Sequence, residues 1–245
     1  MYSSLALAAA LWPAAAAEHC PPQPSTIIIG VAYDSSHKFL YCEYFSKTDE
    51  QQINVDYVRK TTTFAHKELN FSTNLFVPAV TQIDYRNGER RESHIEDNNI
   101  RMTYQENTRK KINSTTIATK DIDIVDAGFN NFVKANWEKL IAGKPLPANF
   151  GSIIHQKSLP LLITAIPVEK CNLQKNSINI QSCFVVDINN SFLRLLLSSI
   201  KISYDSKHRL LQFDGVVNIQ DDLGRSQSAT INYFYKEDYL LTTDY

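Results

Sequence analysis

Residues 126–143, DAGFNNFVKANWEKLIAG, carry the one long amphipathic helix pattern in a chain that otherwise reads as strand after strand. Asp126 is a good N-cap residue, Gly143 suits the C′ position, and Pro145 prevents the helix from continuing. The apolar residues fall in one stripe along a helix, and they are Phe129, Phe132, Val133, Trp137, Leu140 and Ile141. The pattern predicts one helix over residues 126–142. A helix with such an apolar face must lie on another element.

Most of the remaining chain shows strand signals, which are β-branched and aromatic residues bounded by turn residues. The windows are 26–34, 37–47, 52–66, 77–85, 89–96, 100–105, 112–119, 159–168, 178–188, 200–205, 209–219 and 228–235. Asn87-Gly88 is a strong hairpin signal between two of them. We therefore expect a mainly β (α+β) fold, in which a curved antiparallel sheet or incomplete barrel packs on the helix over 126–142. A second, short helix is predicted over 190–199.

The first predicted strand, residues 26–34, is apolar on both faces. Because side chains alternate along a strand, Ile28, Gly30 and Ala32 share one face and the larger residues between them share the other. We expect this strand to be covered on both sides. The small residues Gly30 and Ala32 leave room for the close approach of a helix or a ligand.

Two short segments resemble each other: residues 33–40, YDSSHKFL, and residues 204–211, YDSKHRLL. Each reads as the end of a strand, an Asp-Ser turn and a new strand. A shared turn solution and an ancient duplication both explain this similarity. His37 and His208 occupy equivalent positions, either as exposed turn residues or as a pair that converges for metal binding or acid–base chemistry.

Length and charge limit the class of protein. A chain of 245 residues fits one domain, and a net charge of −1 with a pI near 6.6 lacks the basic excess of a nucleic-acid binder. No segment beyond residue 17 reaches the roughly 20 apolar residues that span a bilayer. We expect no nucleic-acid partner and no transmembrane segment.

The first 17 residues have the character of an export signal. Residues 5–17 form an apolar run that ends in small residues, although no Lys or Arg precedes it. We expect a signal peptide over 1–17 and a single sheet-rich domain over 18–245; a disordered Ala-rich terminus is the alternative. The protein is then exported, and in a Gram-negative cell it is periplasmic.

Four cysteines remain after such a cleavage, and an even number in an exported chain favours disulfides. Cys171 and Cys183 flank a polar stretch and can face each other across a long hairpin, which leaves Cys20 and Cys42 to pair. Four cysteines allow three connectivities, and we favour this one. The alternative, a zinc site, lacks CxxC or HxxxH spacing.

The sequence contains none of the common catalytic signatures. There is no GxSxG, Walker loop, GxGxxG or HExxH motif. We therefore predict no catalytic residues, no metal and no cofactor. An enzyme built from dispersed Asp, His and Tyr residues stays open as a third possibility.

Three segments carry a family resemblance: GVAYDSSHKFLYCEYF from residue 30, AGFNNFVKANWEKLIAGK from residue 127 and LLQFDGVVNIQDDLG from residue 210. Together they resemble an uncharacterised family of exported proteins from Gram-negative bacteria. That resemblance implies a periplasmic or envelope location and no particular activity. The order of elements is also loosely similar to the lipoprotein-carrier fold of the Lol system, an incomplete barrel around helices, and this analogy concerns the fold alone.

Two functions follow as hypotheses. The first is a non-enzymatic periplasmic protein that binds or carries an apolar ligand, such as a lipid or acyl chain, in a mostly apolar pocket. Its candidate pocket residues are Gly30, Ala32, Tyr41, Phe129, Phe132 and Trp137. The second is a structural or interaction protein of the cell envelope, without a small-molecule pocket, whose partner is another envelope protein. A core filled by these same residues would favour the second.

Overall fold

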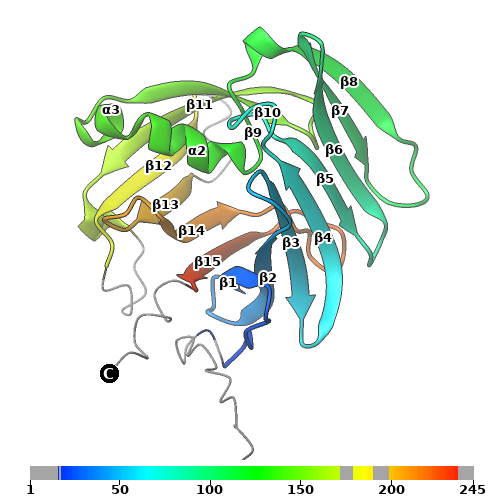
Figure 1. Ribbon diagram of the computed structural model, residues 1–245, viewed down its shortest axis with the longest axis horizontal. Helices are drawn as coiled ribbons and strands as arrows, with labels where there is room; N and C mark the ends of the chain where they lie inside the picture. The colour runs from blue at the N-terminus through cyan, green and yellow to red at the C-terminus, as the bar shows by residue number, and fades with distance from the viewer. Residues whose placement is uncertain (1–15, 17, 172–178, 190–198, 237–245) are drawn as a thin grey trace, which may run out of the picture.

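A computed structural model describes residues 16, 18–171, 179–189 and 199–236, and within them the fold is one curved sheet of 15 strands (Figure 1). The strands are β1 Thr26–Tyr33, β2 Phe39–Lys47, β3 Gln52–Arg59, β4 Thr62–Asn70, β5 Ala79–Asp84, β6 Glu89–Glu96, β7 Asn99–Gln105, β8 Asn113–Ala118, β9 Ile124–Val125, β10 Leu146–Ser152, β11 Lys157–Ile166, β12 Ser182–Ile188, β13 Ile200–Tyr204, β14 Leu210–Val216 and β15 Ser228–Tyr235. The expected mainly β, curved antiparallel architecture is confirmed.

The sheet consists of two antiparallel meanders that meet in its middle. Strands β1 to β8 form the N-terminal half and β10 to β15 form the C-terminal half, and the pairing of β1 with β15 joins them. The short strand β9 pairs in parallel with β10. Figure 1 shows the two halves as facing walls, with the helices between them. The predicted turn at Asn87-Gly88 lies between β5 and β6.

The predicted single helix over residues 126–142 is wrong. The structure has two short helices, α2 (Gly128–Ala135) and α3 (Trp137–Ile141). Asn136 separates them with φ −111° and ψ 19°, and its side-chain amide donates to the carbonyl of Phe132. Asn often competes in this way with regular helix hydrogen bonds. The predicted second helix, over 190–199, falls almost wholly outside the described residues.

The two ends of this helical segment differ in how well the sequence predicted them. Gly143 occupies the C′ position with φ 74°, and its N–H donates to Leu140, while the N–H of Lys144 donates to Lys139. These bonds form a Schellman motif. Asp126 is not the N-cap residue, because Ala127 holds that position and no side chain caps it.

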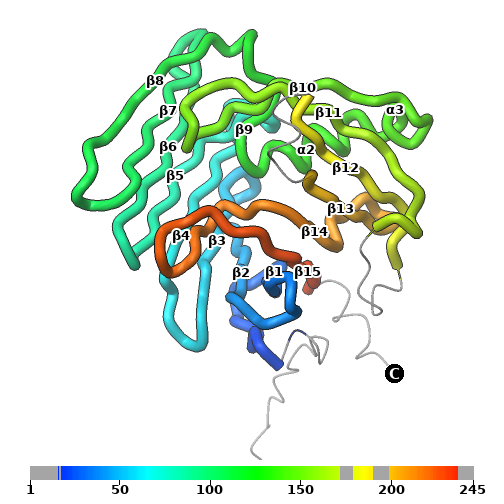
Figure 2. Tube along the Cα trace, turned by 180° about the vertical axis from the view of Figure 1, so that it is seen from behind, coloured from blue at the N-terminus to red at the C-terminus, as the bar shows by residue number. Residues whose placement is uncertain are grey.

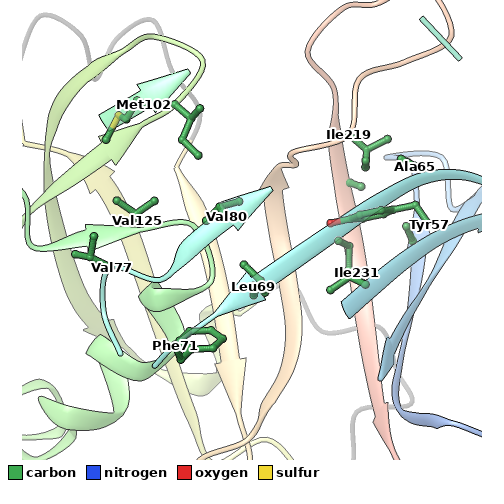
Figure 3. Packing of buried hydrophobic residues seen from close by; sticks show 14 of the residues in the cluster. Tyr57, Ala65, Leu69, Phe71, Val77, Val80, Met102, Val125, Ile219 and Ile231 are labelled. Atoms are coloured by element: carbon green, nitrogen blue, oxygen red, sulfur yellow. The ribbon is translucent and has the colours of Figure 1, made fainter. Parts of the chain in front are cut away.

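The apolar stripe faces the sheet only in part. Val133, Trp137 and Leu140 are buried against the C-terminal half, whereas Ile141 is 50 % exposed. Two further clusters complete the core. One cluster fills the concave face of the N-terminal half, and Figure 3 shows its packing. The other lies on the outer face of β1 and β2 and includes Ile29 and Val31. β1 is thus covered on both faces, as expected.

The two similar segments form the same turn. The carboxylate of Asp34 accepts the N–H groups of Ser36 and Lys38, and that of Asp205 accepts the equivalent two groups. His37 and His208 have φ values of 61° and 57°. Since β1 runs antiparallel to β15, and β15 to β14, the two turns lie at opposite ends of the sheet. The two histidines therefore do not converge.

Two disulfides are present, with the connectivity that we favoured from sequence. Cys20 bonds to Cys42 with a Cα–Cα distance of 5.7 Å, and Cys171 bonds to Cys183 with a Cα–Cα distance of 6.2 Å. Disulfides persist in oxidising compartments, so this pair hints at an exported protein. Among the described residues, no helix is both long and apolar enough to span a bilayer.

Candidate functional site

A stripe of charged and polar side chains crosses the concave face of the N-terminal half. Cross-strand partners in an antiparallel sheet point to the same face, and the register aligns Lys67 with Gln82 and Arg91, and Asp84 with Glu89. All of these side chains are buried, as is Glu43 on β2. Charged side chains are almost never fully buried unless they are paired. The stripe is therefore the most unusual feature of the interior.

Lys67, which is buried, and Asp126, which is largely buried, form an ion pair. The Lys67 Nζ donates to both carboxylate oxygens of Asp126 at 2.7 and 2.8 Å, and Lys67 is 3 % exposed. Asp126 has φ 43°, a left-handed conformation that is uncommon for residues other than glycine. Removing one partner of such a pair typically costs about 3–5 kcal/mol.

The residues on either side of Asp126 hold the start of α2 against the N-terminal half. The N–H of Val125 donates to the carbonyl of Phe76 at 2.9 Å, and a Cβ at Gly128 would collide with that same carbonyl group. The ring of Phe76 also meets Phe132 edge to face, with 5.6 Å between centroids. Glycine at position 128 is thus required by the close approach of two backbones.

Glu43 lies beside this ion pair. The Tyr233 hydroxyl donates to its Oε2 at 3.3 Å, and a Cβ at Gly30 would lie 3.0 Å from that same oxygen and 3.0 Å from the Tyr233 ring. Burial raises the pKa of the Glu43 carboxyl from 4.5 to about 7, although the Lys67 charge and the Tyr233 hydrogen bond act to lower it. Glu43 thus titrates near neutral pH. The small size of Gly30 accommodates Glu43 and Tyr233.

Two more ion pairs continue the stripe. Arg91 donates to Glu89 at 2.8 and 3.0 Å, and Arg86 donates to Asp84 at 2.6 Å. Burial raises the pKa of the Glu89 carboxyl, and the Arg91 charge opposes that rise. Near these pairs, the Tyr41 hydroxyl, Gln82 Oε1 and Ser93 Oγ are buried without a hydrogen-bond partner in the described part of the chain. The hydrogen-bonding capacity of these three interior polar atoms is therefore left unsatisfied by the fold.

The loop between β14 and β15, residues 217–227, closes over the polar stripe. Ile219 is fully buried in the core of the N-terminal half. The carbonyl of Asn218 accepts from Gln82 at 3.2 Å, and its side chain bonds to the Tyr57 hydroxyl. Figure 2 shows this loop reaching across to β3 and β4. Ile219 thus anchors the loop in the interior, while the tip of the loop at Leu223 is exposed.

The concave face of the C-terminal half is apolar throughout the core that α2 and α3 cover. We call this surface the apolar trough; it is lined by Leu161, Ile163, Phe184, Val186, Ile202 and Tyr204. The Trp137 ring lies in it, with centroid distances of 5.3 Å to Phe184 and 5.4 Å to Tyr204, and it stacks on His208 at 3.8 Å. The two halves thus have interiors of different chemistry.

The structure divides the six candidate pocket residues between two places. Ala32 and Tyr41 are fully buried in the core of the N-terminal half, with Gly30 next to them on β1. Phe129, Phe132 and Trp137 pack in or beside the apolar trough. They do not line one common cavity in the conformation that the structure shows.

Cavities are found elsewhere. One of about 300 Å³ lies on the convex face, where Asn54, Glu68 and Thr81 are register neighbours on β3, β4 and β5. Another, of about 230 Å³, lies beside β9, β10 and β11. Neither is lined by any of the six candidates. Among the described residues, no group of three His, Cys, Asp or Glu side chains is arranged to hold a metal ion.

Sequence reasoning missed the charged members of the interior. Lys67 alternates with Ala65 and Leu69, and Glu43 alternates with Tyr41 and Phe45. A charged residue in the inward-facing series of a strand indicates an interior ion pair, and the sequence shows this pattern in both strands. The partner of Lys67 was not predictable, because Asp126 lies 59 residues away in the chain.

Comparisons with known proteins bear only on the fold. No protein-family model matches the chain, and no curated protein matches it. Among solved structures, it is similar to a beta-barrel-like protein of the domain of unknown function DUF1849 from Brucella abortus. The TM-score is 0.50 at 8 % identity, and the match covers 86 % of this chain and 98 % of that one. The fold is thus β-barrel-like.

Proposed function

We propose that this protein is a non-enzymatic binding protein whose apolar trough receives the chain of a lipid-like ligand when α2 and α3 move away. One observation carries this proposal. The trough is a continuous apolar surface, and what covers it is a helical segment broken in its middle, at Asn136. Ligand sites are mostly apolar with a few polar groups, and the trough with its neighbouring charged stripe has that character.

The covering segment is well suited to exchange. Helices of eight and five residues are marginal in isolation, so α2 and α3 depend on their contacts with the sheet. Asp126 and Gly143, each two residues outside the helices, both have positive φ and mark sharp changes of chain direction. An apolar ligand offers the trough the same kind of contact that Val133, Trp137 and Leu140 make.

Export completes the proposal. Residues 1–17 act as a signal peptide, and residues 18–245 form a single mature domain in the periplasm of a Gram-negative cell. The two disulfides, the apolar run near the start and the family resemblance of three segments support this location. The ligand is then a component of the envelope.

Tryptophan fluorescence tests the binding function. The chain has two tryptophans, and Trp12 lies in the proposed signal peptide, so the mature domain over residues 18–245 has Trp137, in the trough, as its single reporter. Titration with myristate below its aggregation concentration should give a saturable red shift, because the ring leaves an apolar site. The loss of that response in a Phe184→Arg variant would localise the ligand to the trough. A titration without saturation or without a shift would refute the proposal.

The second candidate is an interaction protein of the envelope without a small-molecule pocket. It is favoured by the filled interior, since five of the six candidate residues lie in core clusters or pack against them, and both cavities described above lie away from all six. Crosslinking in intact envelopes, followed by purification, distinguishes the two functions. Recovery of a defined heteromeric partner supports this function, and recovery of the monomer alone counts against it.

A further inference from the structure

We propose that the ligand carries a carboxylate headgroup, which replaces Asp126 as the partner of Lys67 while its apolar chain replaces α2 and α3 in the trough. This inference rests on the proposed function and names the chemical class of its ligand. In the structure described here, the segment that begins at Asp126 places one carboxylate on Lys67 and one apolar stripe in the trough.

The first step concerns the charge on Lys67. Its ammonium group lies on the concave face, almost completely buried, and two oxygens of Asp126 satisfy it. A buried ammonium ion is strongly unfavourable without an anionic partner. Any rearrangement that withdraws Asp126 therefore creates a site for another anion at that place.

The second step links Lys67 to the trough. β9 is held by its pairing with β10 and by the bond from Val125 to Phe76, whereas α2 begins two residues after Asp126. Asp126 lies between these two parts, in a left-handed conformation that costs free energy and persists because its surroundings stabilise it. A return of Asp126 to negative φ redirects the helices and withdraws the carboxylate together. Opening of the trough and release of Lys67 are thus one event.

The third step concerns dimensions and charge balance. At about 1.5 Å per residue, Val133 lies about 10 Å along the segment from Asp126 and Leu140 about 20 Å, which is the scale of an extended long acyl chain. One negative charge is withdrawn with Asp126, and a carboxylate ligand restores one. Glu43 stands next to this site with a carboxyl that is largely protonated below neutral pH, so it adds little repulsion there.

The experiment compares ligands that differ only in the headgroup or only in the chain. The mature domain, residues 18–245, is titrated with myristate, with tetradecanol and with acetate, at a pH below 7, and Trp137 emission is followed. We expect myristate to bind on the order of tenfold or more tightly than tetradecanol, since hydrogen bonds to charged groups are the stronger ones. Acetate lacks the chain and should leave Trp137 emission unchanged.

Two substitutions should act in opposite directions. Lys67→Met removes the cation and should reduce the affinity for myristate to that for tetradecanol. Asp126→Asn removes the internal competitor and should raise the affinity for myristate severalfold, because the binding-competent state becomes more populated. A purely structural role for the pair predicts no gain in Asp126→Asn.

Failure of the inference and failure of the proposed function are distinguishable. Equal, saturable binding of myristate and tetradecanol overturns the headgroup assignment and leaves binding in the trough intact. Binding of neither ligand overturns the proposed function itself. If Lys67→Met does not fold, folded Asp126→Asn decides the question, and an unchanged or reduced affinity for myristate contradicts the inference.

Discussion

At the scale of single residues, the interior of this protein shows how charge is kept in a β-sheet core. Lys67, Arg91 and Arg86 each reach a carboxylate within 2.9 Å, and in each pair at least one partner is almost fully buried. Glu43 differs, because its nearest polar partner is the neutral hydroxyl of Tyr233. Burial raises the pKa of the Glu43 carboxyl to about 7, and burial also raises the pKa of the Glu89 carboxyl, where the Arg91 charge opposes the rise.

Glu43 should make stability depend on pH. Its folded pKa of about 7 lies above its ordinary value of 4.5, so the folded state holds a proton that the unfolded state has released in that range. Stability should then fall as pH rises from 4.5 through 7, by about 3 kcal/mol in all. In Glu43→Gln the part of this fall that Glu43 contributes should be absent, while the smaller part from Glu89, whose pKa burial also raises, should remain. Urea unfolding across the range measures it.

Glu68→Gln is the matched control for that prediction. Glu68 lies on β4 with its side chain exposed on the convex face. Its pH profile should follow that of the unaltered protein. A Glu43→Gln variant that retains the full pH dependence would show that Glu43 is ionised throughout the range.

At the scale of elements, the helical segment and the loop at 217–227 are the two parts that fill the interior. A sequence pattern identified the first, because an apolar stripe with a C-terminal glycine is a local signal. The pattern did not predict the conformations of Asn136 and Asp126. The Asn136 side chain donates to the carbonyl of Phe132, and Asp126 accepts from Lys67. The sequence of the loop did not predict that Ile219 is buried, because a polar, Asp-rich stretch is normally exposed.

The uneven burial of the apolar stripe predicts a sharp difference between two of its residues. Trp137→Ala should reduce the free energy of unfolding by about 3–5 kcal/mol, because the ring is buried between Phe184 and Tyr204. Ile141→Ala should cost less than about 1 kcal/mol, because Ile141 is half exposed. Denaturant unfolding gives both values. Equal, large costs would indicate that the whole stripe, including Ile141, is buried.

The loop offers an equally direct comparison. Ile219→Ala should cost about 2–5 kcal/mol, as for a residue of the core. Leu223→Ala, in the same loop, should change stability by less than about 0.5 kcal/mol, because Leu223 is 75 % exposed. Thermal or urea unfolding of the two variants decides whether the loop is a core element. Similar small effects in both would place it at the surface.

At the scale of the whole molecule, the fold joins the first and last strands of the described chain. The pairing of Gly30 with Tyr233 brings together residues from opposite ends of the sequence, and it unites two meanders into one curved sheet. Alternation and turn residues predicted most strands, and the apolar helix pattern led us to expect a curved sheet. They do not encode which distant strands pair, because that choice depends on side chains of both halves at once.

The same reasoning explains the candidate site. Gly30, Ala32 and Tyr41 were selected for their small size or aromatic character, and the structure places them in the core or against it. The polar stripe arises only when the register of β2 to β7 aligns isolated charged residues from several strands. Each residue alone is unremarkable in sequence, and their grouping is a property of the tertiary structure.

Hydrogen exchange of the backbone amides, with and without myristate, tests the central claim most directly. If the ligand replaces the helical segment, amides of α2 and α3 should exchange faster in its presence, while amides of β11 to β13 should be equally or better protected. Binding that leaves α2 and α3 as protected as before, or protects them further, would contradict the account.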